Sequence, residues 1–325
     1  MTDSQQYDLL ILGGGMSYVG AIRAAQLGLK VGLVERDRLG GTCLNRGCIP
    51  SKALLETADL LHRVVEQGGE FGLAGHESIS LDYPALGTRR DAVVDKHVKG
   101  VEFLMKKNGI TIIRGQGTLT GPTTVRVSGG ESGEVEATAT NLMLATGSAP
   151  RSLPGLDIDG KRIITSDEAL TRNDAPGRVT IVGAGAIGVE WASMYRDFGS
   201  EVTLVEFLDR VVPLEDPDIS KELGRVFRKR DIVMHTASKI DTDTIQRTDA
   251  GLRFTIAERE GDKRTEIESD LILVAVGRRP LTDGIGLEQI TGIELDRGYV
   301  KVDGFMRTGV EHLYAIGDIV PGYAL

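Results

Sequence analysis

The chain has 325 residues, an apolar fraction of 41% and a net charge of −9. This acidic balance argues against nucleic acid as a partner, because a surface that binds phosphates is usually basic. No apolar run approaches the roughly 20 residues that cross a bilayer, and no basic region precedes the first apolar run, so we expect a cytoplasmic protein without a membrane span. The length predicts about two domains, each of roughly 150 residues.

The N-terminal segment predicts a strand, a glycine turn, a helix and a second strand. The apolar run YDLLIL leads into three glycines, of which Gly13 and Gly15 take the first two positions of a GxGxxG fingerprint. A helix is expected up to Gly28, and the strand KVGLVER carries Glu35 at its end. In such a βαβ unit, the glycine turn and the helix N-terminus bind a pyrophosphate, and the acid binds a ribose hydroxyl.

The third glycine of this first fingerprint is missing. Tyr18 takes its position and Gly20 comes two residues late, so that one more glycine after Ser17 would restore the spacing. Because the third glycine permits close packing of helix and strand, we expect Tyr18 to push the helix away or to rotate its first turn. The expected consequence is weaker binding of the dinucleotide at this loop.

Both cysteines of the chain, Cys43 and Cys48, lie in the segment GGTCLNRGCIPSKALL. A disulfide between them would close a very small loop and would stabilise the fold little. With His62 as the nearest histidine, the two thiols do not supply the four ligands of a zinc site, and no metal site is expected. The residues after Cys48 predict a helix with Pro50 in its first turn, and a helix N-terminus lowers the pKa of a thiol. The pattern favours redox chemistry; a chance pair of buried thiols is the alternative.

A second βαβ unit is predicted in RVTIVGAGAIGVEWASMYRDFGSEVTLVE. Here the fingerprint is complete, with Gly183, Gly185 and Gly188, and Glu206 ends the second strand. A GxGxxG sequence inside a full strand–turn–helix–strand–acid unit is strong evidence, and two such units imply two dinucleotides. The alternative is that both are glycine-rich turns of an α/β sheet.

The cysteine segment resembles the redox-active segment of the pyridine nucleotide-disulfide oxidoreductases, and within that family the chain is most similar to the dihydrolipoamide dehydrogenases. Four further segments match in the family's order: LATGSAP, GAGAIGVEWAS, VAVGRRPLT and LYAIGDIVPG. The resemblance implies an α/β fold with two Rossmann-like dinucleotide-binding domains, the second inserted in the first. It also implies FAD as the cofactor of the first βαβ unit and NAD as that of the second.

The resemblance implies roles for individual residues. Cys43 would exchange disulfides with the substrate, and Cys48 would face the flavin as a thiolate. Lys52 would lie near the flavin and pair with Glu190, since a buried lysine needs a neutralising acid; solvated surface positions are the alternative for both. The same carry-over assigns FAD binding to Gly13, Gly15, Glu35, Gly41, Thr42, Thr146, Gly147 and Asp318, and NAD binding to Gly183, Gly185, Gly188, Glu206 and Gly277.

Glu206 also bears on the choice of nicotinamide cofactor. An acid at the end of the second strand repels a 2′-phosphate, so the sequence favours NAD over NADP. Arg210, four residues later, weakens this inference slightly.

The order of the motifs predicts an FAD-binding domain at residues 1–148 and 278–325 and an NAD-binding domain at residues 149–277. Within the first, we expect a long helix over 91–107. In the family a further, C-terminal dimerisation domain supplies a His–Glu pair to the partner's disulfide. The chain as given stops without it, and none of its five histidines matches that pair. We therefore expect a homodimer only in a full-length form, and little turnover of dihydrolipoamide by this chain alone.

The sequence thus predicts a flavin-dependent disulfide oxidoreductase. Electrons would pass from dihydrolipoamide through a Cys43–Cys48 disulfide and FAD to NAD⁺. By resemblance, the substrate would be a free or protein-bound lipoyl group, and the partner a 2-oxo acid dehydrogenase complex. Two alternatives stay open: another flavin disulfide reductase, of the glutathione or mercuric reductase type, and a dinucleotide-binding chain without turnover.

Overall fold

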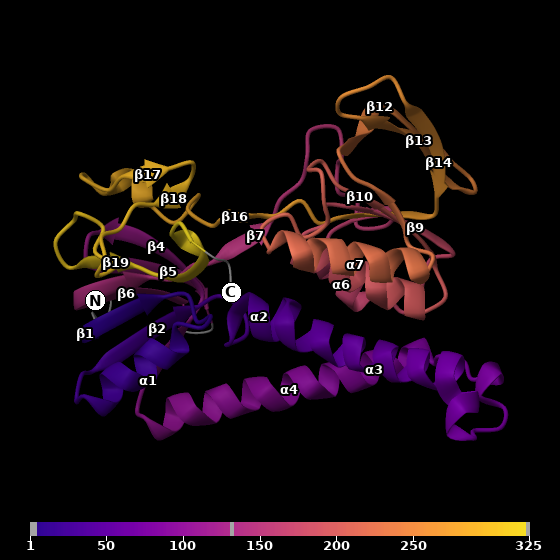
Figure 1. Ribbon diagram of the computed structural model, residues 1–325. Coiled ribbons are helices and arrows are strands. Elements are labelled where there is room, and N and C mark those ends of the chain that lie inside the picture. The colour runs from indigo at the N-terminus through magenta and orange to yellow at the C-terminus, as the bar shows by residue number, and fades with distance from the viewer. Residues whose placement is uncertain (1–4, 131–132, 323–325) are drawn as a thin grey trace. The chain divides into compact units, whose positions relative to one another are not determined.

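The computed structural model (Figure 1) describes residues 5–130 and 133–322 and has the α/β architecture expected from the sequence. The chain divides into two compact units. The first comprises Met1–Ile49, Ala92–Ala149 and Arg279–Leu325, and the second comprises Pro50–Asp91 and Pro150–Arg278. The chain crosses between them in α3 (Cys48–Gln67), α4 (Tyr83–Lys107), β7 (Ser148–Pro150) and β16 (Arg278–Pro280).

The first unit is built on a seven-stranded sheet in the order β3-β2-β1-β6-β5-β4, with β19 beside β6. Strands β1, β2, β3, β6 and β19 pair in parallel, whereas β4 and β5 add an antiparallel hairpin. The strands are β1 (Gln5–Leu12), β2 (Val31–Glu35), β3 (Thr111–Arg114), β4 (Gln116–Gly121), β5 (Thr124–Gly130), β6 (Gly133–Leu144) and β19 (Leu313–Ala315). Every residue of β2 is buried, as expected for a parallel strand that is covered on both faces.

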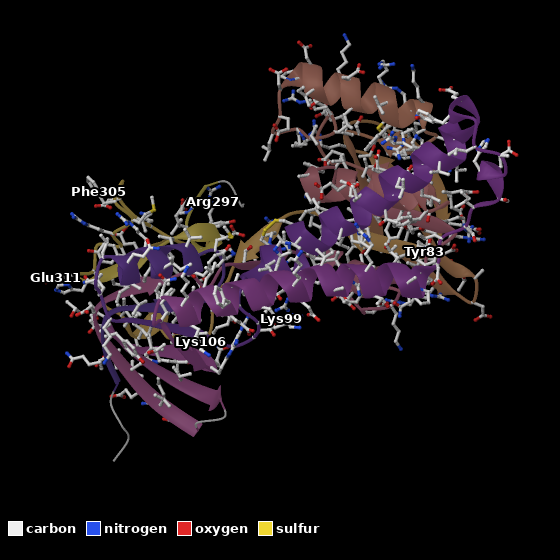
Figure 2. All side chains as sticks on the ribbon, turned by 90° about the horizontal axis from the view of Figure 1, so that it is seen from below. Tyr83, Lys99, Lys106, Arg297, Phe305 and Glu311 are labelled. Atoms are coloured by element: carbon white, nitrogen blue, oxygen red, sulfur yellow. A yellow bond between two sulfur atoms is a disulfide. The ribbon has the colours of Figure 1, made fainter. Side chains whose placement is uncertain are left out.

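One face of this sheet is covered by α1 (Tyr18–Gln26) and by the C-terminal part of α4. The apolar residues of α4 recur at helical spacing and are all buried there: Val94, Val98, Val101 and Met105. Figure 2 shows Lys99 and Lys106 on the same helix, and both are exposed. The helix predicted over 91–107 therefore exists, but it begins eight residues earlier, because Asp82 accepts a hydrogen bond from the Ala85 backbone and Pro84 stands in the first turn.

The second unit contains a parallel sheet in the order β11-β10-β9-β15-β8 and a separate antiparallel sheet in the order β12-β13-β14. The parallel strands are β8 (Ile163–Ile164), β9 (Arg178–Val182), β10 (Glu201–Val205), β11 (Val233–His235) and β15 (Leu271–Val274). The antiparallel strands are β12 (Ser238–Thr248), β13 (Gly251–Glu258) and β14 (Arg264–Ser269). The helices are α5 (Ser166–Thr171), α6 (Ala186–Asp197) and α7 (Pro217–Lys229).

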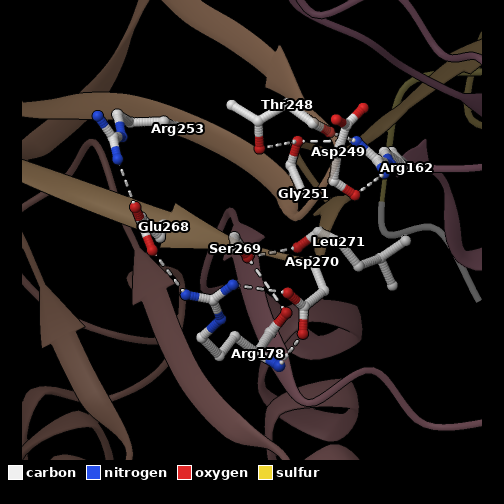
Figure 3. Close-up of polar contacts among 10 residues, drawn as sticks. All are labelled: Arg162, Arg178, Thr248, Asp249, Gly251, Arg253, Glu268, Ser269, Asp270 and Leu271. Atoms are coloured by element: carbon white, nitrogen blue, oxygen red, sulfur yellow. Dashed lines mark hydrogen bonds and ion pairs between the residues drawn. The ribbon is translucent and has the colours of Figure 1, made fainter.

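Charged side chains tie these two sheets together, as Figure 3 shows. Arg178 at the start of β9 pairs with Glu268 in β14 at 3.0 Å and with Asp270, the residue that connects β14 to β15, at 2.9 Å. Arg162 donates to the backbone carbonyl of Gly251 at 2.8 Å. The antiparallel sheet is thereby fixed on the parallel one.

Short elements complete the chain. They are α2 (Gly41–Arg46), η1 (Gly68–Phe71), η2 (His76–Ser78), η3 (Leu287–Gln289), β17 (Leu295–Asp296), β18 (Tyr299–Val300) and η4 (Gly317–Ile319). In the part of the chain that the structure describes, no helix combines the length and the apolarity that a bilayer crossing requires.

The domain boundaries predicted at 148/149 and 277/278 lie within a residue or two of the places where the chain crosses between the two units, in β7 and β16. Residues 50–91, which the sequence places in an FAD-binding domain, group with the second unit instead, because Leu54, Ala58 and Leu86 share a buried core with α6 and β9. The assignment of one cofactor to each domain stays a prediction.

The core of the second unit allows a direct test. Phe254 in β13 is 1% exposed, so its truncation to alanine should lower the free energy of unfolding by about 3–5 kcal/mol. The same truncation at Phe305, which is 76% exposed, should change it by no more than about 0.5 kcal/mol. Urea denaturation of the two variants checks this, and equal effects would contradict the burial assigned to β13.

Candidate active site: a disulfide beside a glycine loop

The two cysteines form a disulfide, with their Cα atoms 4.6 Å apart. Cys43 lies in the short helix α2, which the sequence did not predict, and Cys48 is the first residue of α3. The predicted helix after Cys48 is thus confirmed. Because Cys48 stands at the N-terminus of a 20-residue helix, the positive end of the helix dipole favours its thiolate once the disulfide is reduced.

Gly47, which precedes Cys48, packs closely against the backbone around Cys43. Gly47, at the end of α2, has little room for a side chain: a Cβ there would lie 3.0 Å from the Thr42 carbonyl oxygen and 3.3 Å from Cys43 Cα. A larger residue at position 47 would press against the backbone of Thr42 and Cys43, which would have to shift by a few tenths of an ångström. Gly47 was not among the predicted site residues, although a glycine at the end of a helix is a recognisable sequence signal.

Asn45, between the cysteines, holds the start of α2 to the preceding loop. Its amide donates to the backbone carbonyls of Leu39 and Gly41, both at 3.0 Å. Gly41 itself has a φ of +59°, and a Cβ there would lie 2.6 Å from Gly15 Cα. The disulfide segment therefore packs backbone to backbone against the first glycine loop.

That first loop is closed by a buried carboxylate. Gly13 has a φ of +108°, and a Cβ there would lie 2.3 Å from the Ala145 carbonyl oxygen, so that only glycine fits. The two oxygens of Glu35 accept hydrogen bonds from the backbone N–H groups of Gly14 and Asp37, each at 2.7 Å. A buried Glu35 thus joins the end of β2 to the glycine turn after β1.

The second loop repeats this construction. Gly183 has a φ of +99°, and a Cβ there would lie 2.4 Å from the Ala275 carbonyl oxygen. The buried Glu206 accepts from the backbone N–H groups of Ala184 at 2.6 Å and Leu208 at 2.8 Å. A Cβ at Gly188 would lie only 1.9 Å from the Gly183 carbonyl oxygen, which shows why the third glycine is needed here.

The residues of both loops fit a dinucleotide. Among the described residues, the backbone N–H groups at the start of α6, from Ala186 to Gly188, have no acceptor. Free N–H groups at the positive end of a helix attract a pyrophosphate. In the first unit, a crevice at the carboxyl ends of β1 and β2 is lined by Glu35, Gly115, Thr146 and Leu281, which is where parallel sheets bind ligands.

The other predicted cofactor-binding residues lie as follows. The Thr146 hydroxyl donates to the Leu281 carbonyl at 2.7 Å, so it is engaged within the protein. Asp318, in η4, accepts from the Ser148 hydroxyl at 2.6 Å, a partner that sequence reasoning missed. Gly147 and Gly277 have φ values of +77° and +107° with open space around them, and Thr42 is half-buried in α2.

Lys52 and Glu190 form the ion pair that the resemblance implies, with Nζ 2.7 Å from Oε1. The Lys52 side chain is 56% exposed. An exposed pair of this kind contributes at most about 1 kcal/mol to stability. The pair joins α3 to α6, and the role of either residue beside a flavin stays a prediction.

Across residues 5–130 and 133–322, no cluster of three or more His, Cys, Asp or Glu side chains is placed to hold a metal ion.

The packing at Gly47 leads to a testable expectation. Replacing Gly47 by alanine should strain the oxidised form and shift the equilibrium of the disulfide with glutathione about tenfold toward the dithiol, equivalent to about 30 mV. Thiol counting in glutathione buffers measures this. Gly100→Ala in α4, where an added Cβ meets nothing within 4 Å, is the matched control. An unshifted Gly47→Ala equilibrium would contradict the packing argument.

Comparison with known proteins agrees with this site. The family model described as pyridine nucleotide-disulphide oxidoreductase matches residues 7–325. The chain is 43% identical to dihydrolipoyl dehydrogenase of Bacillus subtilis, covering 98% of this chain and 68% of the relative. It is 41% identical to dihydrolipoamide dehydrogenase of Chaetomium thermophilum, covering 97% and 62%. The chain thus spans about two thirds of the length of these relatives.

Solved structures give the same result. The crystal structure of LpdA from Mycobacterium tuberculosis superimposes with a TM-score of 0.87 at 27% identity, covering 99% of this chain and 69% of that one. The Cu(II) complex of the HOCl-induced flavoprotein disulfide reductase RclA from Escherichia coli has a TM-score of 0.83 at 26% identity, covering 99% and 68%. The chain belongs to the pyridine nucleotide-disulphide oxidoreductase family.

Proposed function

We propose that the chain carries the electron-transfer path of a dihydrolipoyl dehydrogenase, from a dithiol through the Cys43–Cys48 disulfide and FAD to NAD⁺. The observation that carries the proposal is the disulfide at the start of α3, packed through Gly41 against the first of two dinucleotide loops. FAD, when bound, supplies the group that passes an electron pair between the disulfide and the nicotinamide. The identity to two proteins with the corresponding name supports the choice of substrate.

The exchange step balances in atoms and electrons once the two substrate thiols have lost their protons to the solvent. A substrate thiolate attacks Cys43 Sγ, a substrate–Cys43 disulfide forms, and the Cys43–Cys48 bond breaks with Cys48 leaving as the thiolate. The N-terminus of α3 stabilises that thiolate. The second substrate thiolate then attacks the substrate sulfur of the mixed disulfide, which releases the Cys43 thiolate and the oxidised substrate. The electron pair has passed from the dithiol to the two cysteines.

Lys52 and Glu190 complete the proposed site. Lys52 follows Cys48 by four residues, so both lie on the same face of α3. Glu190 fixes the Lys52 ammonium at 2.7 Å and keeps its charge partly neutralised. In this proposal Lys52 would supply a positive charge near the flavin, and the ion pair with Glu190 limits the movement of its ammonium group.

The finer parts of the proposal follow from the family resemblance. They are FAD at the first loop, NAD at the second, a lipoyl group of a 2-oxo acid dehydrogenase complex as substrate, a homodimeric full-length form, and a cytoplasmic location.

The redox path is tested by counting thiols. With FAD bound, anaerobic addition of NADH should produce two new thiols per chain, because the disulfide is the acceptor of the electron pair. The variants Cys43→Ser and Cys48→Ser, which retain the loops, should produce none. If NADH is consumed and no thiols appear in the unmodified chain, the chain binds dinucleotides without using its disulfide, and the proposal fails.

Cofactor choice is tested at Glu206. The unmodified chain should bind NADH more tightly than NADPH by about 1–3 kcal/mol, since the carboxylate accepts from the ribose and repels a 2′-phosphate. Glu206→Gln removes the charge and should narrow the gap, while Glu201→Gln, at the exposed start of the same strand, should leave it unchanged. Fluorescence titration with both cofactors measures this, and equal affinities in the unmodified chain would remove the case for Glu206.

A further inference from the structure

The two glycine loops start their helices differently. In the second loop, the first turn of α6 is α-helical: the Val189 N–H donates to the Gly185 carbonyl, four residues back, at 3.0 Å. In the first loop the Tyr18 N–H donates to Gly15 and the Val19 N–H to Met16, each only three residues back, at 3.2 and 3.1 Å. The first turn before α1 is therefore a tight 3₁₀ turn, which uses three residues where an α-helix uses 3.6.

This tight turn explains how the loop accommodates Tyr18. At the equivalent place in the second loop only Gly188 fits, because a Cβ would lie 1.9 Å from the Gly183 carbonyl oxygen. A tyrosine could not occupy that position. In the first loop the turn winds more tightly, and Tyr18 packs half-buried against the apolar core between α1 and the sheet. The sequence-based expectation that Tyr18 pushes the helix away or rotates its first turn stays a prediction; what the structure shows is a 3₁₀ first turn.

In the first loop, Ser17 contacts the carbonyl group of the first glycine. Ser17 is only 4% exposed, and its hydroxyl donates a hydrogen bond to the Gly13 carbonyl at 2.5 Å. In the second loop the corresponding carbonyl, that of Gly183, is covered by Gly188. The carbonyl of the first glycine is thus contacted in both loops, by the Ser17 hydroxyl in the first and by the Gly188 backbone in the second.

The backbone N–H groups show what this bond preserves. Within residues 13–19, the N–H of Gly13 bonds to Val34, that of Gly14 to Glu35, and those of Tyr18 and Val19 to the tight turn. Among the described residues, the N–H groups of Gly15, Met16 and Ser17 have no acceptor. Three consecutive free donors at the start of a helix suit a pyrophosphate.

We infer that Ser17 is a positioning residue for the flavin pyrophosphate, standing in for the missing third glycine. Its hydroxyl ties the tight turn to Gly13 and keeps the N–H groups of Gly15, Met16 and Ser17 directed at one anion. The inference rests on the proposed function, because it takes FAD as the ligand of the first loop. The inference also replaces the expectation that Tyr18 weakens dinucleotide binding at this loop, since the Ser17–Gly13 hydrogen bond supports the shortened loop.

The experiment measures FAD affinity of the apo-chain by quenching of flavin fluorescence. Ser17→Ala should weaken FAD binding about 3- to 10-fold, the loss expected for one hydrogen bond that orders the site. Ser17→Thr, which keeps the hydroxyl, should stay within twofold of the unmodified chain. Inserting a glycine after Ser17 in the Ser17→Ala background should restore affinity, because the standard loop then becomes possible. NADH affinity should change in none of these variants.

Thr88→Ala is the matched control, since the Thr88 hydroxyl also donates to a carbonyl four residues back, at 3.0 Å, but in α4. This variant should bind FAD like the unmodified chain. If Ser17→Ala binds FAD as tightly as the unmodified chain, or if Ser17→Thr loses as much affinity as Ser17→Ala, the inference about Ser17 is overturned while the proposed function stands. If the unmodified chain binds no FAD, both are overturned.

Discussion

One buried carboxylate closes the glycine loop of each βαβ unit, Glu35 in the first and Glu206 in the second. Glu35 is the last residue of β2, and Glu206 directly follows β10. Each accepts hydrogen bonds from two backbone N–H groups, one in the glycine turn and one two residues after the glutamate. A buried carboxylate is costly unless hydrogen bonds satisfy it, and two charge-assisted bonds do so here. Each oxygen keeps further lone pairs, so a ribose hydroxyl can still be bound.

The first glycine loop is also bonded to the segment that carries the disulfide. The Gly14 carbonyl accepts from the Gly40 backbone at 2.7 Å, and Gly40 begins the segment that carries the disulfide. With Gly41 against Gly15, the helix α2 has little freedom relative to the first loop. The Asn45 bonds to the Leu39 and Gly41 carbonyls and the close packing of Gly47 against Cys43 also hold this segment in place.

Much of this could be predicted from the sequence because the signals are local. Strand–turn–helix patterns and the helix after Cys48 depend mainly on neighbouring residues. The start of α4 at Asp82 and Pro84 is also a local signal, but it lies outside the apolar stripe on which the helix prediction rested. The rest depends on contacts between distant segments: the shared core of Leu54 and Leu86 draws residues 50–91 into the second unit. The Ser148–Asp318 bond joins residues 170 positions apart, and no spacing rule predicts it.

Tyr18 illustrates the limit of motif reasoning. The fingerprint correctly indicates that something must change when the third glycine is absent, but it does not say what. The answer depends on the competition between an α-helical and a 3₁₀ first turn, and on the chance that the residue before Tyr18 carries a hydroxyl. Likewise, the pairing of Lys52 with Glu190 follows from a motif, whereas the exposure of Lys52 follows from the packing around it.

We propose that flavin and disulfide form one electron path in this chain, and the absorbance spectrum during anaerobic reduction with one equivalent of NADH is the decisive measurement. We expect a broad absorbance at wavelengths above the flavin bands, from the Cys48 thiolate in contact with the flavin, present in the unmodified chain and absent in Cys48→Ser. Bleaching of the flavin without that absorbance, or an identical spectrum in Cys48→Ser, would show that the two groups do not form one path.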